Sequence, residues 1–553
     1  MKIIFAFDFV TPIYDNRDII PIGLLSLATL LKQDGHVVEV VDLNEISATT
    51  LASGSHDGRY ERLAGYIVEK EPSIVGFTTM CGSFHTILLL AQEIKKMNCQ
   101  IKVILGGPQA SSVPAETIQA FPCIDLVVIG EGEKVIGQAI AALVTGDLAT
   151  VPGIAYREQE IVVINPPAGL IDDLDSLPMI DLDLIKNRRW RVTMEVGRGC
   201  PFSCVFCNTS SFWRRKFRVK SVERIGREIE AIKEVAGCPL YITFVDDNFT
   251  TDYKYTLRLC AKLGELGIHW NCDARLDTLD ERLIAAMAAS GCDSVLMGIE
   301  SGSPRMQKLI NKNLDLTTID KVIDLLVSYK MKPILSFMYG FPDENDADVR
   351  LTLELIYGML KKGVYICALH SLAVLAGTAL YEACAGRLVM KEYYSDLTDA
   401  ADFESCREFI SAHPALFPHF YTLTGSTAER YRLLDRFINY ILIKLYSYFP
   451  RSFDAIIGYF GGDILLFYKD FVTSEEGFGK FFLERETVSA AVAAKNLTPR
   501  MIGFLFDYIS GKAAVDICFK VFARTAGGEL EQLEQSIARL RQSRPMRTTD
   551  TEA

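Results

Sequence analysis

Short apolar runs alternate with amphipathic segments along the first 165 residues. The apolar runs predict buried strands at 2–7, 37–43, 73–79, 101–107 and 125–133. Segments with apolar positions at helical spacing lie between them, at 22–35, at 84–97 and from about 114. Strands that alternate with helices form a parallel sheet covered on both faces. The pattern therefore predicts a doubly wound, Rossmann-like α/β domain over residues 1–165.

The residues that end these predicted strands are small or polar. They are Thr78, Thr79, Gly106, Gly107, Pro108, Gly130, Glu131, Gly132 and Glu133. Ligands of such sheets bind at the carboxyl ends of strands, and glycine lets a ligand approach the backbone. A glycine there can also simply turn the chain, but three such sites on one edge favour a ligand. A dinucleotide is disfavoured because no G-x-G-x-x-G follows the first strand.

A second alternation follows residues 166–187, a proline-rich acidic stretch that predicts a linker. Strands or strand ends are predicted at 191–196, 241–249, 269–275, 294–303, 332–345 and 366–378. Helices are predicted between them at 221–236, 252–267, 279–290, 316–329 and 347–362. We expect this second domain to extend over 188–400.

The composition of the 553-residue chain is that of a globular protein, with 49% hydrophobic and 23% charged residues. A net charge of −12 argues against a nucleic-acid partner. We interpret the basic run 213–220 as a solvated stretch rather than a phosphate site. No signal peptide and no membrane span are visible, and most cysteines are scattered singly. These features predict a cytoplasmic protein.

Three cysteines lie within "GRGCPFSCVFCNTS", residues 197–210. Cys200, Cys204 and Cys207 have the spacing C-x3-C-x2-C, directly after a predicted strand. Structural zinc normally requires a fourth Cys or His nearby, and ferredoxin-type clusters use four thiolates at other spacings. Three thiolates around a four-iron cluster leave one iron open to the donor atoms of another molecule. The motif therefore predicts an iron–sulfur site with both metal-binding and catalytic roles.

The C-x3-C-x2-C loop resembles the signature of the radical S-adenosylmethionine (SAM) superfamily. The resemblance implies that the open iron of a 4Fe-4S cluster binds SAM, whose reductive cleavage gives a 5′-deoxyadenosyl radical. It also implies a partial (β/α)6 barrel of the TIM type, which fits the strands and helices of the second domain. Phe206 is then expected to lie against the adenine.

Two groups of strand-end residues match SAM-binding positions of that superfamily. The resemblance places Asp246, Asp247 and Asn248 near the methionine end of SAM, where they hold its ammonium group. It places Glu300 and Ser301 against the ribose or methionine part. An alternative for the two aspartates is that they form the N-cap of the helix that follows.

The order of doubly wound domain, linker and radical domain resembles the cobalamin-binding subgroup over residues 1–400. The resemblance implies a corrinoid between the two domains, with its upper face toward the cluster. One departure is that D-x-H-x-x-G, which supplies a cobalt-binding histidine in other corrinoid proteins, is absent. His85 could approach the lower face of the corrinoid, although a lone histidine near a helix start is more often a structural hydrogen-bonding group.

Residues 401–553 predict a mainly helical domain that is dense in aromatic residues between 417 and 482. Most of these aromatics are expected to form a core. The domain is expected to cap the barrel and contact the substrate. His413 and His419, each beside a proline, are candidate substrate contacts. The helical tail also argues against the methylthiotransferase branch, which has a small β-rich RNA-binding tail.

The leading hypothesis is a methyltransferase that uses SAM, a 4Fe-4S cluster and cobalamin. Its methyl acceptor would be an unactivated carbon, or phosphorus, of a natural-product, peptide or lipid substrate. The cluster would need an external electron donor such as flavodoxin or ferredoxin. The second hypothesis keeps both cofactors but performs an oxidation, cyclisation or ring contraction without methyl transfer. The third is a non-enzymatic corrinoid or redox sensor.

Overall fold

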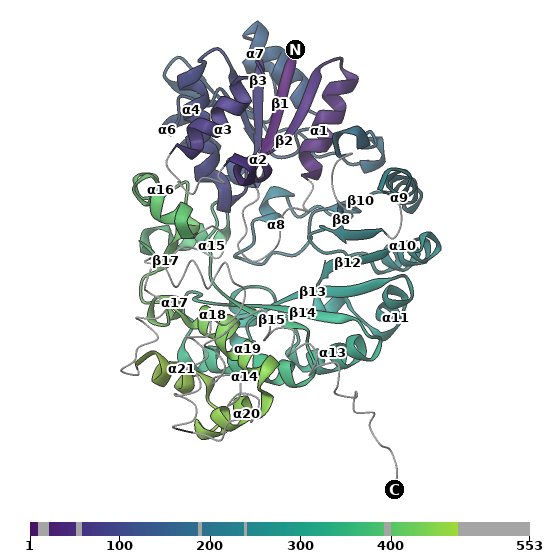
Figure 1. The fold of residues 1–553 in the computed structure, drawn as a ribbon, viewed down its shortest axis with the longest axis vertical. Coiled ribbons are helices and arrows are strands. Elements are labelled where there is room, and N and C mark those ends of the chain that lie inside the picture. The colour runs from purple at the N-terminus through teal and green to yellow at the C-terminus, as the bar shows by residue number, and fades with distance from the viewer. Residues whose placement is uncertain are drawn as a thin grey trace.

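Two sheets and a group of carboxyl-terminal helices make up the computed structural model of the protein (Figure 1). It describes residues 1–8, 21–50, 58–185, 191–236, 240–391, 400–473 and 512. The first sheet lies at the top of Figure 1, the second lies below it, and the later helices lie at the lower left.

The first sheet has seven strands in the order β2-β1-β3-β4-β5-β6-β7. Their bounds are β1 (Lys2–Phe7), β2 (Val37–Asp42), β3 (Ile74–Thr78), β4 (Lys102–Gly106), β5 (Leu126–Val128), β6 (Ile154–Glu158) and β7 (Ile161–Ile164). The first five strands are parallel, as predicted. The last two add an antiparallel hairpin to the edge at β5, which the sequence pattern did not predict.

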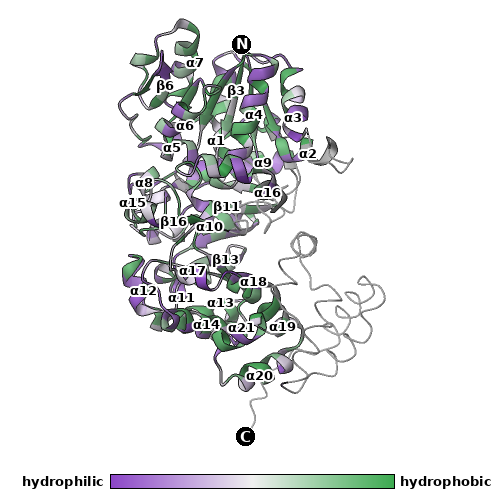
Figure 2. Cartoon of the chain, turned by 90° about the vertical axis from the view of Figure 1, so that its left-hand side faces the viewer, coloured by the Kyte–Doolittle hydropathy of each residue, from purple (hydrophilic) through white to green (hydrophobic). Residues whose placement is uncertain are grey.

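Helices cover both faces of this sheet, which confirms the doubly wound prediction. One face packs against α1 (Ile22–Gln33) and α7 (Ile136–Thr145). The other face packs against α3 (Arg59–Val68), α4 (Phe84–Met97) and α6 (Pro114–Ala120). The shorter helices α2 (Leu43–Thr50) and α5 (Pro108–Ser112) follow strands β2 and β4. In Figure 2 these helices carry both hydrophobic and hydrophilic residues, as expected of helices with one buried face.

The second sheet is parallel and open, in the order β8-β11-β12-β13-β14-β15. Its strands are β8 (Arg191–Met194), β11 (Tyr241–Phe244), β12 (His269–Ala274), β13 (Cys292–Glu300), β14 (Lys332–Tyr339) and β15 (Ile366–Ser371). Its helices are α9 (Val222–Ala236), α10 (Tyr253–Leu266), α11 (Glu281–Ala289), α12 (Pro304–Leu309), α13 (Ile319–Ser328) and α14 (Asp346–Lys361). Helical connections join the six parallel strands and the sheet does not close, which confirms the partial barrel.

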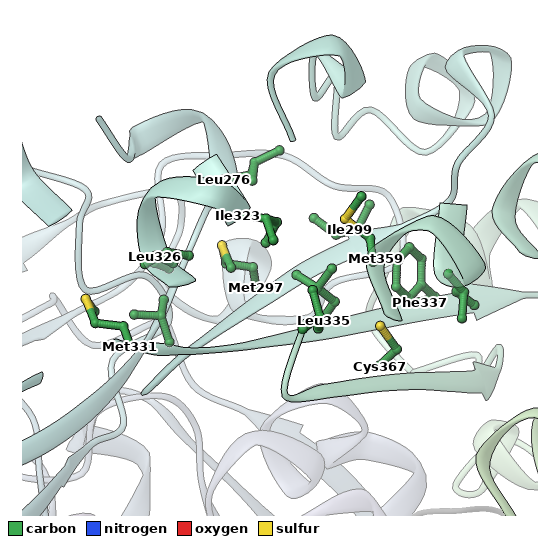
Figure 3. Packing of buried hydrophobic residues seen from close by; sticks show 14 of the residues in the cluster. Leu276, Met297, Ile299, Ile323, Leu326, Met331, Leu335, Phe337, Met359 and Cys367 are labelled. Carbon is green, nitrogen blue, oxygen red and sulfur yellow. The ribbon is translucent and has the colours of Figure 1, made fainter. Parts of the chain in front are cut away.

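The core of this barrel lies between the sheet and its helices (Figure 3). Met297 of β13 and Leu335 and Phe337 of β14 point into it, beside Met359 of α14. All four side chains are almost wholly buried. Burial of apolar surface of this kind stabilises the fold by roughly 25 cal/mol per Å². The packed layer fixes the strands whose carboxyl ends carry the predicted site residues.

The later helices pack against both domains. The helix α16 (Ala400–Ala412) and the turn Pro418–Phe420 contribute Phe403, Phe417 and Phe420 to the core around α4. A small hairpin joins β16 (Leu388–Met390) to β17 (Tyr421–Leu423). The helix α15 (Ala379–Cys384) packs in a small separate apolar cluster. The helices that join the barrel core are α17 (Thr427–Arg430), α18 (Leu434–Arg436), α19 (Ile443–Tyr448), α20 (Pro450–Tyr459) and α21 (Ile464–Thr473).

Among the residues that the structure describes, no helix is both long and apolar enough to cross a membrane.

Candidate active site

The three cysteines share one loop between β9 (Gly197–Arg198) and α8 (Thr209–Phe212). Each is partly buried and none is in a disulfide. Gly199 turns the chain ahead of Cys200 with φ +93°, and a Cβ there would overlap the carbonyl oxygen of Lys216. Only glycine therefore fits this position without strain.

The three thiols lie close to one another and to positive charge. Burial raises the pKa of the Cys200 thiol to about 11, and nearby Asp247 and the other two thiols raise it further. Burial also raises the pKa of Cys204, but Lys312 and Arg275 oppose this shift. Arg275 Nη1 lies 3.9 Å from Cys204 Sγ. Among the residues that the structure describes, the three thiols do not converge into a preformed metal-binding group. A metal cluster binds thiolates, and the two cations beside Cys204 favour that form.

Backbone hydrogen bonds fix the middle of this loop to the barrel. The Val205 amide donates to Ile310 O at 3.1 Å, and the Leu380 amide donates to Val205 O at 3.0 Å. The Phe206 ring lies 5.7 Å from the ring of Phe341, within a small apolar cluster. These apolar surroundings suit a flat aromatic ligand. Contact of Phe206 with adenine stays a prediction.

The carboxylates after β11 hold the cysteine loop in place. Asp246 is buried and accepts hydrogen bonds from the amides of Val196, at 3.1 Å, and Gly197, at 2.6 Å. Burial raises the pKa of Asp246 to about 8, and these two hydrogen bonds oppose the shift. Asp247 accepts from the Gly199 amide and from Thr209 Oγ1, both at 3.1 Å.

Asn248 connects this group to the next strand, because its Oδ1 accepts from the Arg275 amide at 3.1 Å. The alternative that Asp246 and Asp247 cap the next helix is wrong. The N-cap of α10 is Asp252, whose side chain accepts from the Tyr255 amide. Binding of the SAM ammonium by residues 246–248 stays a prediction.

Glu300 ends β13 in a left-handed conformation, with φ +67°, where the register with β14 shifts. Its carboxylate pairs with Lys312 Nζ at 2.5 Å, and both side chains are largely buried. Ser301 is wholly buried, and its Oγ lies 3.1 Å from Thr352 Oγ1. Of this pair, Glu300 belongs to the charged surroundings of the cysteine loop, whereas Ser301 bonds within the protein.

A cavity of about 250 Å³ opens at the predicted edge of the first sheet. The predicted residues that line it are Thr78, Gly106, Gly107, Pro108, Gly130, Glu131, Gly132 and Glu133. Thr79 does not line it, because its Oγ1 donates to Gly106 O at 2.8 Å and accepts from the Ala110 amide at 2.9 Å. A Cβ at Gly106 would meet nothing nearer than 3.9 Å, so the space beside it is open to a ligand.

Residues of the second domain that the sequence pattern did not indicate complete this cavity. They are Glu195, Arg198, Phe212 and Trp213. The interpretation of 213–220 as a solvated stretch is therefore wrong for Trp213, and also for Arg218 and Lys220, which are buried. It holds for Arg214, Arg215 and Lys216, which are exposed. Only Trp213, the aromatic residue that begins this run, could have signalled this role.

A buried ionic network joins the two domains beside the cavity. Arg198 contacts Glu131 at 2.8 Å, Glu133 at 2.7 Å and Glu195 at 2.8 Å. Arg218 contacts the other oxygen of Glu131 at 2.7 Å. Burial opposes ionisation of Glu131, but hydrogen bonds from Arg218 and Arg198 outweigh it and lower the pKa of this carboxyl. Both carboxylate oxygens of Glu131 are therefore paired with arginines.

The predicted histidine contacts lie elsewhere. His85 is wholly buried on α4, on the face of the sheet opposite the cavity, with its ring 5.7 Å from that of Phe420. It therefore cannot approach a ligand in the cavity, and that alternative is wrong. His419 is also wholly buried, and its ring packs 4.2 Å from that of Phe420. His413 packs on Phe121 of the first domain at 4.9 Å. The burial of His419 argues against its predicted contact with the substrate, whereas His413 is only partly buried and its contact stays a prediction.

Comparisons with known proteins agree with this division of the chain. The sequence profile of the radical SAM superfamily matches residues 194–356, and that of the B12 binding domain matches residues 15–140. The chain is 30% identical over 343 residues to an uncharacterized methyltransferase, PH0819, of Pyrococcus horikoshii, covering 60% of this chain and 72% of that protein.

Two further proteins are similar to this chain. It is 26% identical to the anaerobic magnesium-protoporphyrin IX monomethyl ester cyclase of Rubrivivax gelatinosus, and the match covers 62% of each chain. Among solved structures, the cobalamin-dependent SAM radical enzyme OxsB with aqua-cobalamin bound superimposes with a TM-score of 0.63. That match has 16% sequence identity and covers 98% of this chain and 84% of OxsB, so it concerns the fold.

Radical SAM and B12-binding domains in one chain define the class of protein. This chain belongs to the family of B12-binding radical SAM enzymes, as the sequence predicted, and its relatives include methyltransferases.

Proposed function

We propose that this protein is a cobalamin-dependent radical SAM methyltransferase. Its methyl donor is SAM, and its acceptor is an unactivated carbon, or phosphorus, of a natural-product, peptide or lipid substrate. One observation carries the proposal. Arg198, before the cysteines, and Phe212 and Trp213, after them, all line the cavity of the B12-binding domain. Both flanks of the cysteine loop therefore border the cavity, which supports a site shared by the two cofactors.

The residues of each domain have separate duties in this proposal. Cys200, Cys204 and Cys207 hold the cluster, and Asp246 and Asp247 fix the backbone of their loop. When bound, the cluster supplies the electron that cleaves SAM, and the cobalamin supplies a carrier for its methyl group. The two cations beside Cys204, Lys312 and Arg275, favour the thiolate state and an anionic ligand such as the SAM carboxylate.

The cavity in the first domain suits part of a large, flat cofactor. Gly106 and Gly130 leave backbone exposed on one side, since no atom lies within 3.4 Å of a Cβ built on either. Phe5, Leu24 and Ile104 provide an apolar floor. Phe212 and Trp213 close the side that faces the cysteine loop. Apolar walls on two sides suit the apolar surface of such a cofactor.

A half-reaction tests the proposal without the natural substrate. Anaerobic protein with a reconstituted cluster is incubated with SAM, added cobalamin and titanium(III) citrate. We expect S-adenosylhomocysteine from methyl transfer to the reduced cobalamin, and slow formation of 5′-deoxyadenosine. Replacing all three cysteines of the loop with alanine should abolish 5′-deoxyadenosine.

The same assay separates the second candidate, a radical cyclase or oxidase without methyl transfer. The similarity to the anaerobic cyclase favours this alternative. Formation of 5′-deoxyadenosine without any S-adenosylhomocysteine would favour the cyclase and contradict the methyltransferase. We further propose a cytoplasmic location. We also propose an external one-electron donor, such as flavodoxin or ferredoxin, because reductive cleavage of SAM at the cluster consumes one electron.

A further inference from the structure

The proposed function gives the charged network around Arg198 no part in cleaving SAM. This network is nevertheless deeply buried among the described residues. The side chains of Glu131, Glu133, Arg198 and Arg218 are 2–7% exposed. Burying charges is unfavourable unless they are paired and hydrogen-bonded. Because of this desolvation cost, the buried network is weak evidence for a stabilising role. Its position between the two domains is more informative about its function.

Arg198 connects the two cofactor sites through its own backbone and side chain. It lies two residues before Cys200, in the short strand β9. Its guanidinium reaches Glu131 and Glu133, which follow β5 of the other domain. A third carboxylate, Glu195, directly follows β8 and accepts hydrogen bonds from Nε and Nη2 of Arg198. One side chain therefore attaches the start of the cysteine loop to the edge of the B12-binding sheet.

The end of the cysteine loop is attached to the same place. Trp213 follows α8, and the guanidinium carbons of Arg198 and Arg218 lie 5.9 Å and 5.3 Å from its ring centroid. A cation over an aromatic face is attractive, most strongly over tryptophan. The two arginines therefore hold Trp213 as a wall of the cavity. Both flanks of the cysteine loop are fixed by one network.

We propose that Arg198 is a positioning residue that makes cluster binding and cobalamin binding cooperative. This inference rests on the proposed function. A cluster bound to the loop fixes the main chain on either side of the cysteines and so orders Arg198 and Trp213. The cavity wall is then ordered before cobalamin binds, so cobalamin binding no longer includes the entropy loss of ordering these residues. By linkage, cobalamin strengthens the retention of the cluster by the same factor.

The inference is tested by measuring one equilibrium and one rate in four proteins. The dissociation constant of added cobalamin is measured by absorbance in anaerobic protein with and without the reconstituted cluster. The rate at which a chelator removes iron is measured with and without cobalamin. In the wild type we expect the cluster to tighten cobalamin binding about tenfold, the usual size of such couplings. Cobalamin should slow iron loss in the same protein.

The test variant is Glu133→Gln, which keeps the shape of the side chain but removes one charge between the domains. The matched control is Glu228→Gln, because Glu228 is similarly buried but pairs with Arg224 at 2.6 Å inside the second domain. We expect the tenfold ratio to fall to about one in Glu133→Gln and to persist in Glu228→Gln. Arg198→Lys, which keeps the charge but cannot span three carboxylates, should behave like Glu133→Gln.

Each outcome decides the question. An unchanged ratio in both Glu133→Gln and Arg198→Lys would overturn the inference and leave the proposed function intact. An equal loss in Glu228→Gln would also overturn it, because the effect would then be one of general stability. Absence of cobalamin binding in every protein would overturn the inference and the proposed function together.

Discussion

Glu344 is a buried carboxylate at the junction of the barrel and the later helices. It accepts hydrogen bonds from the Gly340 amide, at 2.7 Å, and from Thr427 Oγ1. Burial raises its pKa from 4.5 to about 7, and these two hydrogen bonds oppose the shift. The folded protein therefore favours the protonated form of Glu344.

This raised pKa predicts a pH dependence of stability. The contribution of Glu344 to the free energy of unfolding is fully present below pH 4.5 and is lost as the pH rises through 7. The loss is on the order of 3 kcal/mol. Glu344→Gln keeps both accepted hydrogen bonds and cannot ionise, so the variant should lose less stability between pH 5 and pH 8 in urea unfolding. Glu354→Gln, on the exposed side of α14, is the control. The same pH dependence in wild type and Glu344→Gln would contradict this account.

Adjacent glycines at the cavity should respond differently to alanine. Gly107 has φ +90°, and a Cβ there would lie 2.9 Å from the Thr79 backbone, whereas a Cβ at Gly106 has open space. We expect Gly107→Ala to lower the free energy of unfolding by about 1–3 kcal/mol and Gly106→Ala to change it by less than about 1 kcal/mol. Urea unfolding measures both. Equal losses would show that the backbone at Gly107 is not constrained as described.

At the scale of elements, the local pattern predicted the parallel strands and their helices, because each segment carries its own periodicity. The antiparallel strands β6 and β7 were missed because β7 is half exposed and its apolar run is short. The Cys200 loop was predictable because its three metal-binding cysteines lie close together in the sequence. The pairing of Arg198 with Glu131 was not, because residues 67 positions apart meet only through the fold.

The edge strand β15 illustrates another contact that only the structure shows. The Asn439 side chain accepts from the Leu369 amide at 2.9 Å and donates to Leu369 O at 2.7 Å. It thus replaces a neighbouring strand at one position of the open edge. Asn439→Ala should cost about 1–3 kcal/mol in unfolding free energy, because two partly buried backbone groups lose a partner. Asn98→Ala, at the exposed end of α4, should cost much less. A loss no larger than that of Asn98→Ala would contradict this role.

At the scale of the molecule, the later helices belong to the core of the barrel. Phe437, Phe453 and Phe467 are wholly buried in the cluster that also contains Trp270 of β12. A chain that ends near residue 400 would expose this surface and leave β15 uncovered. We expect such a truncated chain to aggregate or to lose its cooperative unfolding transition, measured by circular dichroism on heating. A soluble truncated chain with the melting temperature of the full protein would show that the helices are an independent module.

The central claim is that the cavity beside the cysteine loop holds cobalamin. The most direct measurement is the cobalamin and iron content of anaerobically reconstituted wild type, Gly106→Leu and Gly65→Leu. Leucine at Gly106 enters the cavity without backbone strain, whereas Gly65 lies on α3, on the opposite face of the sheet, with space around it. We predict about one cobalamin per chain in the wild type and in Gly65→Leu, very little in Gly106→Leu, and iron in all three. Full cobalamin content in Gly106→Leu, or none in the wild type, would contradict the account.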